Sequence, residues 1–186
     1  KKAKKNSEKI FKLITKKIIK LPILEAELTK LFNNAWRYLK FSIANQFYQI
    51  SINKGLDFNK IRHAMTEGYA RADDFPKSGF AAGPCLFKDT MQLASFSRQD
   101  FTLGHSAMLV NETMPEFLVD KVKLRHNLKN KKVGILGMAF KPDSDDKRES
   151  LAYKLKKILK IEGSDVSCTD IYIKDKTFKT VITLIK

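Results

Sequence analysis

The segment GFAAGPCLFKDT, residues 79–90, holds residue types suited to covalent chemistry. Two glycines and a proline precede a lone cysteine, Cys85, and Asp89 follows four residues later. The glycines indicate a backbone that bends sharply or approaches a ligand closely. Proline is favoured at the first position of a helix, so we expect a helix to begin at Pro84 with Cys85 in its first turn. The helix dipole there favours a thiolate, and Asp89 would share its helix face. The alternative is a small buried hydrophobic residue after a loop.

A second pair of polar residues lies in a segment with a helical pattern. Lys30 and Asn34 are four residues apart, so a helix would place an ammonium and an amide on one face. Asparagine is a weak helix former, and two in succession at Asn33 and Asn34 need a reason. The alternative is a solvated lysine beside a surface amide.

The stretch VGILGMAFKPDSDDKRES, residues 133–150, begins as a buried parallel strand and continues into a polar loop. Open sheets bind ligands at the carboxyl ends of their strands, and Lys141 and Arg148 in this loop are suited to holding phosphates. The two glycines are three residues apart and a third is absent, so the G-x-G-x-x-G of a NAD site is not matched, although Asp170 stands where its ribose acid would be.

The first 130 residues carry a helical pattern. The helices in this region must position Cys85, Lys30 and Asn34. Residues 1–20 read as a basic helical segment, and apolar residues at three- and four-residue steps predict a long helix from Leu24 to about Asn53. A second apolar face of that helix is formed by Trp36, Ile43, Phe47 and Ile50. A helix that is apolar on two sides is central in a fold or lies at an oligomer interface. Further helices are expected over residues 57–69, 84–97 and 105–128, the last kinked or divided by Pro115.

The pattern changes at residue 131. A strand is expected over residues 133–140, an amphipathic helix over 149–163 and a second strand over 165–172, with Cys168 in the core. This β-loop-α-β unit opens a doubly wound parallel sheet. Residues 177–186 are a candidate for another strand. The predicted fold is therefore mixed, an all-helical domain followed by the start of an α/β domain.

Composition bounds the partners. The chain of 186 residues can bury one good core or two small ones, and it has no apolar run long enough to cross a membrane. Two distant cysteines make neither a disulfide framework nor a zinc site, and they indicate a reducing, cytoplasmic setting. The isolated histidines His63, His105 and His126 are expected at the surface or satisfied in the core. A net charge of +16 favours an anionic partner, but lysine is scattered along the chain, so charge alone does not choose among nucleic acid, a nucleotide and an acidic surface.

Three stretches together carry a resemblance. The segment EAELTKLFNNAWRYLKFSIANQF, then GFAAGPCLFKDT, then VGILGMAFKPDSDDKRES resemble, in order and spacing, the UDP-glucose/UDP-N-acetylmannosamine dehydrogenases, which are nucleotide-sugar 6-dehydrogenases. The resemblance covers about residues 20–172. It implies a central helical dimerisation and catalytic domain over residues 23–130 and part of a Rossmann-like UDP-binding domain over 131–186. Residues 1–22 would be the tail of a missing NAD-binding domain, in keeping with a first residue that is Lys rather than Met.

The resemblance also implies roles for individual residues. Cys85 would be the nucleophile in an NAD-dependent oxidation of a UDP-sugar's C6 alcohol to the uronic acid, through a thiohemiacetal and a thioester. Asp89 would orient or activate water, and Lys30 and Asn34 would stabilise the oxyanion. The substrate-binding residues implied are Lys30, Asn34, Arg71, Gly79, Phe80, Phe140 and Lys141, and the cofactor-binding residues are Lys88 and Arg148. Arg71 would reach the substrate of a neighbouring subunit.

The expected partners are a UDP-sugar, NAD and a second copy of the chain, with no metal, nucleic acid or membrane. The form GPC at residues 83–85 is associated with the branch that oxidises N-acetylated sugars, and the setting implied is polysaccharide biosynthesis. The chain alone is expected to be inactive. The alternatives are an inert dimerisation fragment and a basic module that binds a polyanion or nucleic acid, the latter supported by charge alone. Past Tyr172 the sequence no longer follows the family.

Overall fold

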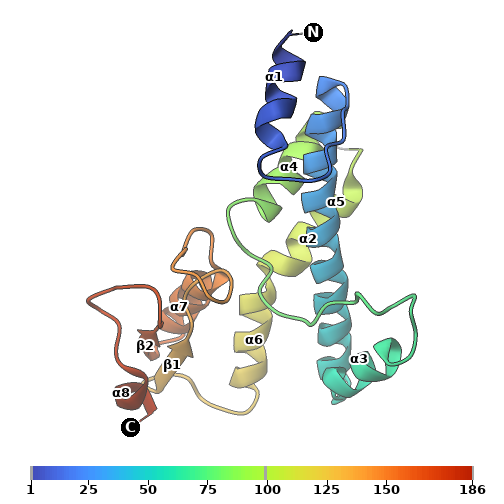
Figure 1. The fold of residues 1–186 in the computed structure, drawn as a ribbon. Helices are drawn as coiled ribbons and strands as arrows, with labels where there is room; N and C mark the ends of the chain where they lie inside the picture. The colour runs from blue at the N-terminus through green and yellow to red at the C-terminus, as the bar shows by residue number, and fades with distance from the viewer. Residues whose placement is uncertain (1, 99, 186) are drawn as a thin grey trace.

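The computed structural model of the protein describes residues 2–98 and 100–185 (Figure 1). A helical part runs as far as Lys123, and a small α/β part with two parallel strands follows it. The mixed fold expected from the sequence is confirmed.

The helical part is built on α2, Ile23–Asn53, a helix of 31 residues and therefore about 46 Å long. It begins one residue before the predicted start and ends at the predicted residue, with Gly55 just beyond it at φ +69°. Two later helices, α4 (Leu86–Phe96) and α5 (Thr102–Glu112), pack against α2 and against each other. Within the described ranges, neither α2 nor any other helix is both long and apolar enough to span a membrane.

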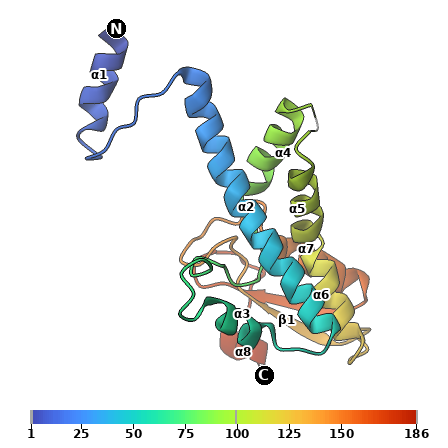
Figure 2. The ribbon, with the colours of Figure 1, turned by 90° about the vertical axis from the view of Figure 1, so that its right-hand side faces the viewer.

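The N-terminal helix is shorter than the basic segment predicted it to be. Helix α1, Lys2–Phe11, ends where the chain turns, and Lys20 comes back to pair with Glu8 at 2.5 Å. The prediction of a helix up to residue 20 is therefore wrong past Phe11. The chain turns there, and Lys20 lies back beside Glu8 of α1. Figure 2 shows α1 standing apart from the helical body.

Two further helices end earlier than expected. Helix α3, Phe58–Thr66, is capped by Asp57, whose carboxylate accepts from the backbone of Asn59 and Lys60. The pattern over residues 105–128 proves to be two helices, α5 and α6 (Met114–Lys123). Pro115 divides them because proline cannot continue the hydrogen bonding of a preceding helix but suits the first turn of the next one.

The α/β part pairs β1, Lys132–Leu136, with β2, Asp165–Thr169, in a parallel ladder joined through α7, Leu151–Ile161. Both strands are shorter than predicted, since the ladder runs only from Lys132 opposite Asp165 to Leu136 opposite Thr169. The core between sheet and helices consists of Val119, Leu128, Ile135, Met138, Ala152, Leu159, Cys168 and Ile173. Val119 belongs to α6, so this helix joins the helical part to the α/β part.

The last described segment does not form the strand that its composition suggested. Val181–Ile185 is the short helix α8, with the Thr180 hydroxyl accepting from the backbone N–H of Thr183. The side chain of Leu184 lies over Gly134 of β1 and leaves no room for a Cβ there. Residues 181–185 therefore cover the sheet, and residue 186 lies outside the described residues.

Candidate active site

Cys85 lies at the N-terminal end of α4 with an exposed side chain. The helix begins at Leu86, two residues later than predicted, because its first backbone hydrogen bond runs from the N–H of Asp89 to the carbonyl of Cys85 at 2.9 Å. Cys85 is therefore the N-cap residue and Pro84 precedes it. Cys85 thus lies at the positive end of the helix dipole, and its side chain makes no capping hydrogen bond.

Asp89, one turn further along α4, is the centre of a polar cluster. The ammonium of Lys30 and the amide of Asn34, both on α2, donate to its Oδ2 atom. The Asp89 side chain is 1% exposed, whereas that of Lys30 is 60% exposed. The other carboxylate oxygen, Oδ1, is buried without a hydrogen-bond partner among the described residues. The packing of α4 on α2 thus brings together three of the four residues expected to act in catalysis, and Cys85 lies one turn away.

The charge state of Asp89 follows from these contacts. Burial is the largest single influence and would raise the pKa of Asp89, but the hydrogen bonds from Lys30 and Asn34 outweigh it. The pKa of Asp89 is therefore lowered, and the group is a carboxylate at neutral pH.

The loop before Cys85 is anchored by a residue that the sequence analysis missed. Asn45 of α2 is fully buried, donates its amide to the carbonyl of Gly79 at 2.9 Å and accepts from the N–H of Gly79 at 2.8 Å. It also donates to Oδ1 of Asn111 at 2.9 Å, and Asn111 donates to the carbonyl of Tyr38. Asn45 is eleven residues after Asn34, which is three helical turns, so both face the same side of α2. An asparagine inside a predicted helix was the feature that singled out Asn34, and the same feature would have singled out Asn45.

The α/β part meets this loop at Gly83. Its φ is +103°, and a Cβ at this position would lie 2.5 Å from the ring of Phe140. The N–H of Gly83 points to the carbonyl of Glu149 at 3.4 Å, and Glu149 itself has a left-handed φ of 52°. Glycine is therefore needed at position 83 for both its backbone angle and its contact with Phe140.

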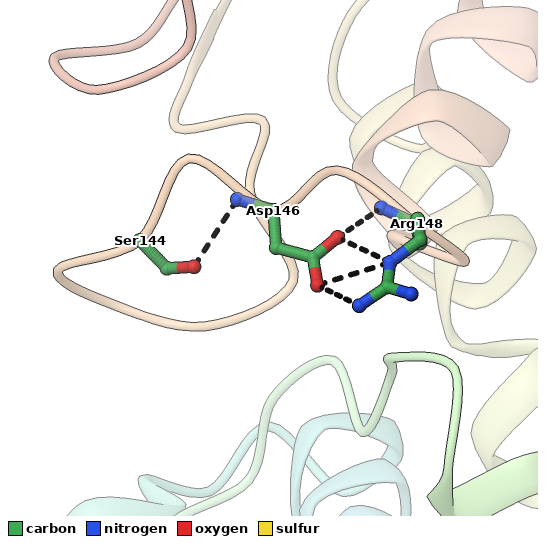
Figure 3. A network of polar contacts seen from close by, with 3 residues as sticks. All are labelled: Ser144, Asp146 and Arg148. Atoms are coloured by element: carbon green, nitrogen blue, oxygen red, sulfur yellow. Dashed lines mark hydrogen bonds and ion pairs between the residues drawn. The ribbon is translucent and has the colours of Figure 1, made fainter.

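Arg148 lies in the loop between β1 and α7 and is held by Asp146 (Figure 3). The guanidinium donates to both carboxylate oxygens of Asp146, with the shortest distance at 2.7 Å from Nη2 to Oδ2. These hydrogen bonds lower the pKa of Asp146 to about 2 and raise the pKa of Arg148. Arg148 is thus a charged group one residue before Glu149, whose carbonyl faces Gly83 in the turn before Cys85.

Lys141 borders a pocket of about 550 Å³ at the carboxyl ends of the two strands. Asp170 and Tyr172 line the same pocket. The Asp170 carboxylate accepts from four backbone N–H groups, those of Met138, Ala139, Tyr172 and Ile173. Burial opposes ionisation of Asp170, but these hydrogen bonds prevail and lower its pKa. Asp170 therefore holds the loop after β1 in shape.

The remaining predicted residues lie further from the cluster. Phe80 lines an apolar groove of about 1,020 Å³ shared with α2, α6 and β1. Arg71 is exposed on the loop after α3, and within the described ranges no hydrogen bond or ion pair joins it to Asp89. Across residues 2–98 and 100–185, no three His, Cys, Asp or Glu side chains group as a metal site would require.

Two cations and one carboxylate of the described residues bear on the binding of a dinucleotide. Lys88, exposed in the first turn of α4, and Arg148 are cations suited to a cofactor phosphate. Both oxygens of Asp170 already accept backbone N–H groups, so this carboxylate is not free to hold a ribose. The described residues thus fit contacts to the phosphates of NAD and do not form a cradle for the whole dinucleotide.

Known proteins share this arrangement, in which a cysteine lies at the start of a helix that packs on a long helix and a small α/β part follows. Residues 24–113 match the central domain, and residues 134–185 the UDP binding domain, of the UDP-glucose/GDP-mannose dehydrogenase family. The two matches follow each other in family order and together cover most of the chain. The second match runs to residue 185, so the expectation that the sequence no longer follows the family past Tyr172 is wrong. The chain belongs to this family.

Individual relatives agree with the assignment. The chain is 33% identical over 153 residues to the UDP-glucose 6-dehydrogenase AglM of Haloferax volcanii, a match that covers 80% of this chain and 36% of that protein. It is 30% identical over 180 residues to a UDP-N-acetyl-D-mannosamine dehydrogenase of Pyrococcus horikoshii, covering 93% of this chain and 43% of the relative. The chain thus spans well under half the length of these curated relatives.

Solved structures show the same architecture. A UDP-D-ManNAc dehydrogenase structure from Pyrococcus horikoshii matches all of this chain and 45% of its own, with a TM-score of 0.87 at 26% identity. A UDP-glucose dehydrogenase from Pyrobaculum islandicum matches 78% of this chain and 35% of its own, with a TM-score of 0.71 at 31% identity.

Proposed function

We propose that this chain forms the catalytic cluster and part of the UDP-binding domain of an NAD-dependent nucleotide-sugar 6-dehydrogenase. The observation that carries the proposal is the exposed Cys85 thiol at the start of α4, one turn from a buried carboxylate that is held by Lys30 and Asn34. Membership of the nucleotide-sugar dehydrogenase family supports the proposed class of substrate, a UDP-sugar oxidised at C6.

Cys85 is proposed to work by covalent capture. The C6 alcohol first loses a hydride and a proton to become an aldehyde, and Sγ then bonds to the carbonyl carbon to give a thiohemiacetal. Loss of a second hydride and of the hydroxyl proton leaves a thioester. Water adds to the thioester carbon, the carbon–sulfur bond breaks, and the uronic acid and the thiolate are released. The covalent bond keeps the aldehyde from leaving between the two oxidations.

Asp89, Lys30 and Asn34 are proposed to serve the addition and hydrolysis steps. The unpartnered Oδ1 atom of Asp89 can accept a hydrogen bond from the attacking water, and its lowered pKa keeps it ionised. Lys30 has further N–H donors, on a side chain that is largely exposed, for the oxyanion formed at C6. A single donor of this kind stabilises a transition state by about 3 to 4 kcal/mol.

Two molecules of NAD, bound one after the other, would each accept one hydride. Lys88 and Arg148 are the residues of this chain that would hold the phosphates of NAD. Asp146 engages Arg148 through Nε and Nη2, so a phosphate would be met by Nη1 of the same guanidinium.

Lys141, Phe140, Phe80 and Gly79 are the proposed substrate contacts, with Arg71 acting on a neighbouring subunit. Lys141 borders the pocket at the strand ends, where a nucleotide phosphate would be neutralised. The second copy of the chain is proposed to pair along the exposed apolar side of α2.

The test is an assay of the enzyme that contains this chain with NAD and, in parallel, UDP-glucose, UDP-N-acetylmannosamine and GDP-mannose. We expect NADH and the uronic acid in a ratio of two to one with one of the UDP-sugars, since two hydrides leave per product. Absence of NADH formation with all three substrates would reject the proposed function.

A further inference from the structure

A continuous set of contacts leads from the loop after β1 to the turn that holds Cys85. The N–H of Phe140 donates to the carbonyl of Asp146 at 3.1 Å, which closes the loop on itself, and the Asp146 side chain holds Arg148. At the far end of the loop, the carbonyl of Glu149 faces the N–H of Gly83. The ring of Phe140 covers the Cα of Gly83, two residues before Cys85.

The contact at Gly83 is tight and is made at some cost. A Cβ on Gly83 would lie 2.5 and 2.6 Å from two carbons of the ring, so the ring fills the space beside the backbone. Glu149 keeps a left-handed φ of 52°, which is strained for a residue with a side chain. A conformation of this kind persists only where its surroundings hold it, and here the Glu149 carbonyl faces Gly83.

We propose that Phe140 is a positioning residue. When the substrate's nucleotide binds at the loop of residues 140–149, Phe140 transmits that binding to the turn that holds Cys85. Lys141, next in the chain, lines the pocket at the strand ends, so a nucleotide bound there presses on the residue beside Phe140. Movement of the ring changes the space available to Gly83 and hence the position of the thiol. This inference rests on the proposed function, because it takes the nucleotide to be UDP.

The two cysteines make the proposal measurable. Cys85 is exposed and Cys168 is 1% exposed, so alkylation by iodoacetamide reports on Cys85 while Cys168 stays protected. The labelling rate is measured with and without saturating UDP, whose binding is followed by calorimetry in the same samples. In the parent protein we expect UDP to change the rate by about fivefold or more, the lower end of ordinary coupling between two sites.

Two variants break the contact from opposite sides. Phe140→Leu removes the ring, and Gly83→Ala introduces a methyl group where the ring lies. Both are expected to bind UDP at saturation, Phe140→Leu more weakly because Phe140 is also a proposed substrate contact, but to label Cys85 at the same rate with or without UDP. Phe140→Leu is expected to label faster than the parent even without UDP. Phe178→Leu is the matched control, since Phe178 packs on the α/β core away from Gly83, and it should respond to UDP as the parent does.

The outcomes separate the inference from the proposed function. A variant that binds UDP and keeps the parent's response overturns the inference alone. Loss of UDP binding in both variants also counts against it, because the contact would then serve binding and not transmission. A parent that does not bind UDP contradicts the proposed function instead, and the ligand-free labelling rate of Phe140→Leu still tests the contact.

Discussion

Cys85 and Asp89 are separated by one helical turn, yet one side chain is exposed and the other almost completely buried. The sequence predicted that Cys85 and Asp89 share one helix face and that Lys30 and Asn34 share another, because helical spacing depends only on neighbouring residues. It did not predict that α2 lies across the start of α4, so that Lys30 and Asn34 engage Asp89. That contact joins residues more than fifty positions apart in the chain and depends on packing.

Replacing Asp89 with asparagine tests the cluster. We expect kcat of the enzyme to fall by about 100-fold or more, the usual contribution of a positioned acid or base, because the variant lacks a carboxylate for water. The unfolding free energy should fall by about 1 to 2 kcal/mol as the hydrogen bonds to a charged acceptor weaken. The matched control is Asp74→Asn, which alters an exposed pair between Lys40 of α2 and Asp74. It should leave kcat unchanged and shift stability by less than about 0.5 kcal/mol. Equal effects in both variants would remove the special role of Asp89.

The same carboxylate predicts a pH dependence. Because the pKa of Asp89 is lower in the folded protein than in the unfolded chain, its stabilising contribution is present above the unfolded value, about 4, and is lost as the pH falls through the folded value. The difference in unfolding free energy between parent and Asp89→Asn should therefore shrink on acidification in denaturant titrations. A difference that grows towards low pH would contradict the lowered pKa.

At the scale of elements, α2 presents one face to both the Asp89 cluster and the loop before Cys85. Lys30, Asn34 and Asn45 follow a helical spacing, with the fully buried Tyr38 between them. The sequence predicted the bounds of this helix well, since its apolar pattern is long and regular. It predicted short elements poorly: α8 forms where a strand was expected, and α4 begins two residues late. Contacts outside the local pattern act on both, namely Leu184 over Gly134 for α8 and a hydrogen bond to the carbonyl of Cys85 for α4.

Asn45 is the element-scale contact most open to test. In Asn45→Ala, the buried Oδ1 atom of Asn111 loses its donor and both backbone groups of the exposed Gly79 lose their partner, so we expect destabilisation of about 1 to 3 kcal/mol. Thermal unfolding measures it. The control is Asn33→Ala, an exposed position on the same helix, where alanine should be neutral or slightly stabilising. A loss below about 0.5 kcal/mol at position 45, the range of ordinary surface substitutions, would show that the loop is held by other contacts.

At the scale of the whole molecule, α2 also exposes an apolar stripe. Its members are Phe32, Trp36, Ile43, Phe47 and Ile50, each at least 40% exposed. They recur at steps of three, four and seven residues, which places them along one side of the helix. A stripe of this extent is typical of a surface that pairs with another molecule. This supports the proposed symmetric dimer.

The dimer prediction is tested by light scattering. The parent should show about twice the chain mass of 21.3 kDa. Trp36→Glu should shift it towards the monomer, because a charge would be buried in the interface. Ile161→Glu on α7 makes the same chemical change at a 73% exposed position away from α2 and should remain dimeric. A concentration-independent monomer in the parent would remove the interface from the account.

The central claim is that Cys85 is the covalent nucleophile, and the most direct measurement is uronic acid formation by Cys85→Ser in the enzyme that contains this chain. We predict no net uronic acid, with UDP-sugar binding close to that of the parent, because the exposed thiol forms the bond to C6 and the surrounding fold is unaffected. Cys168→Ala, which alters the buried cysteine of β2, should still form product. Product formation at the parent rate by Cys85→Ser would show that Cys85 is structural and that the covalent mechanism is wrong.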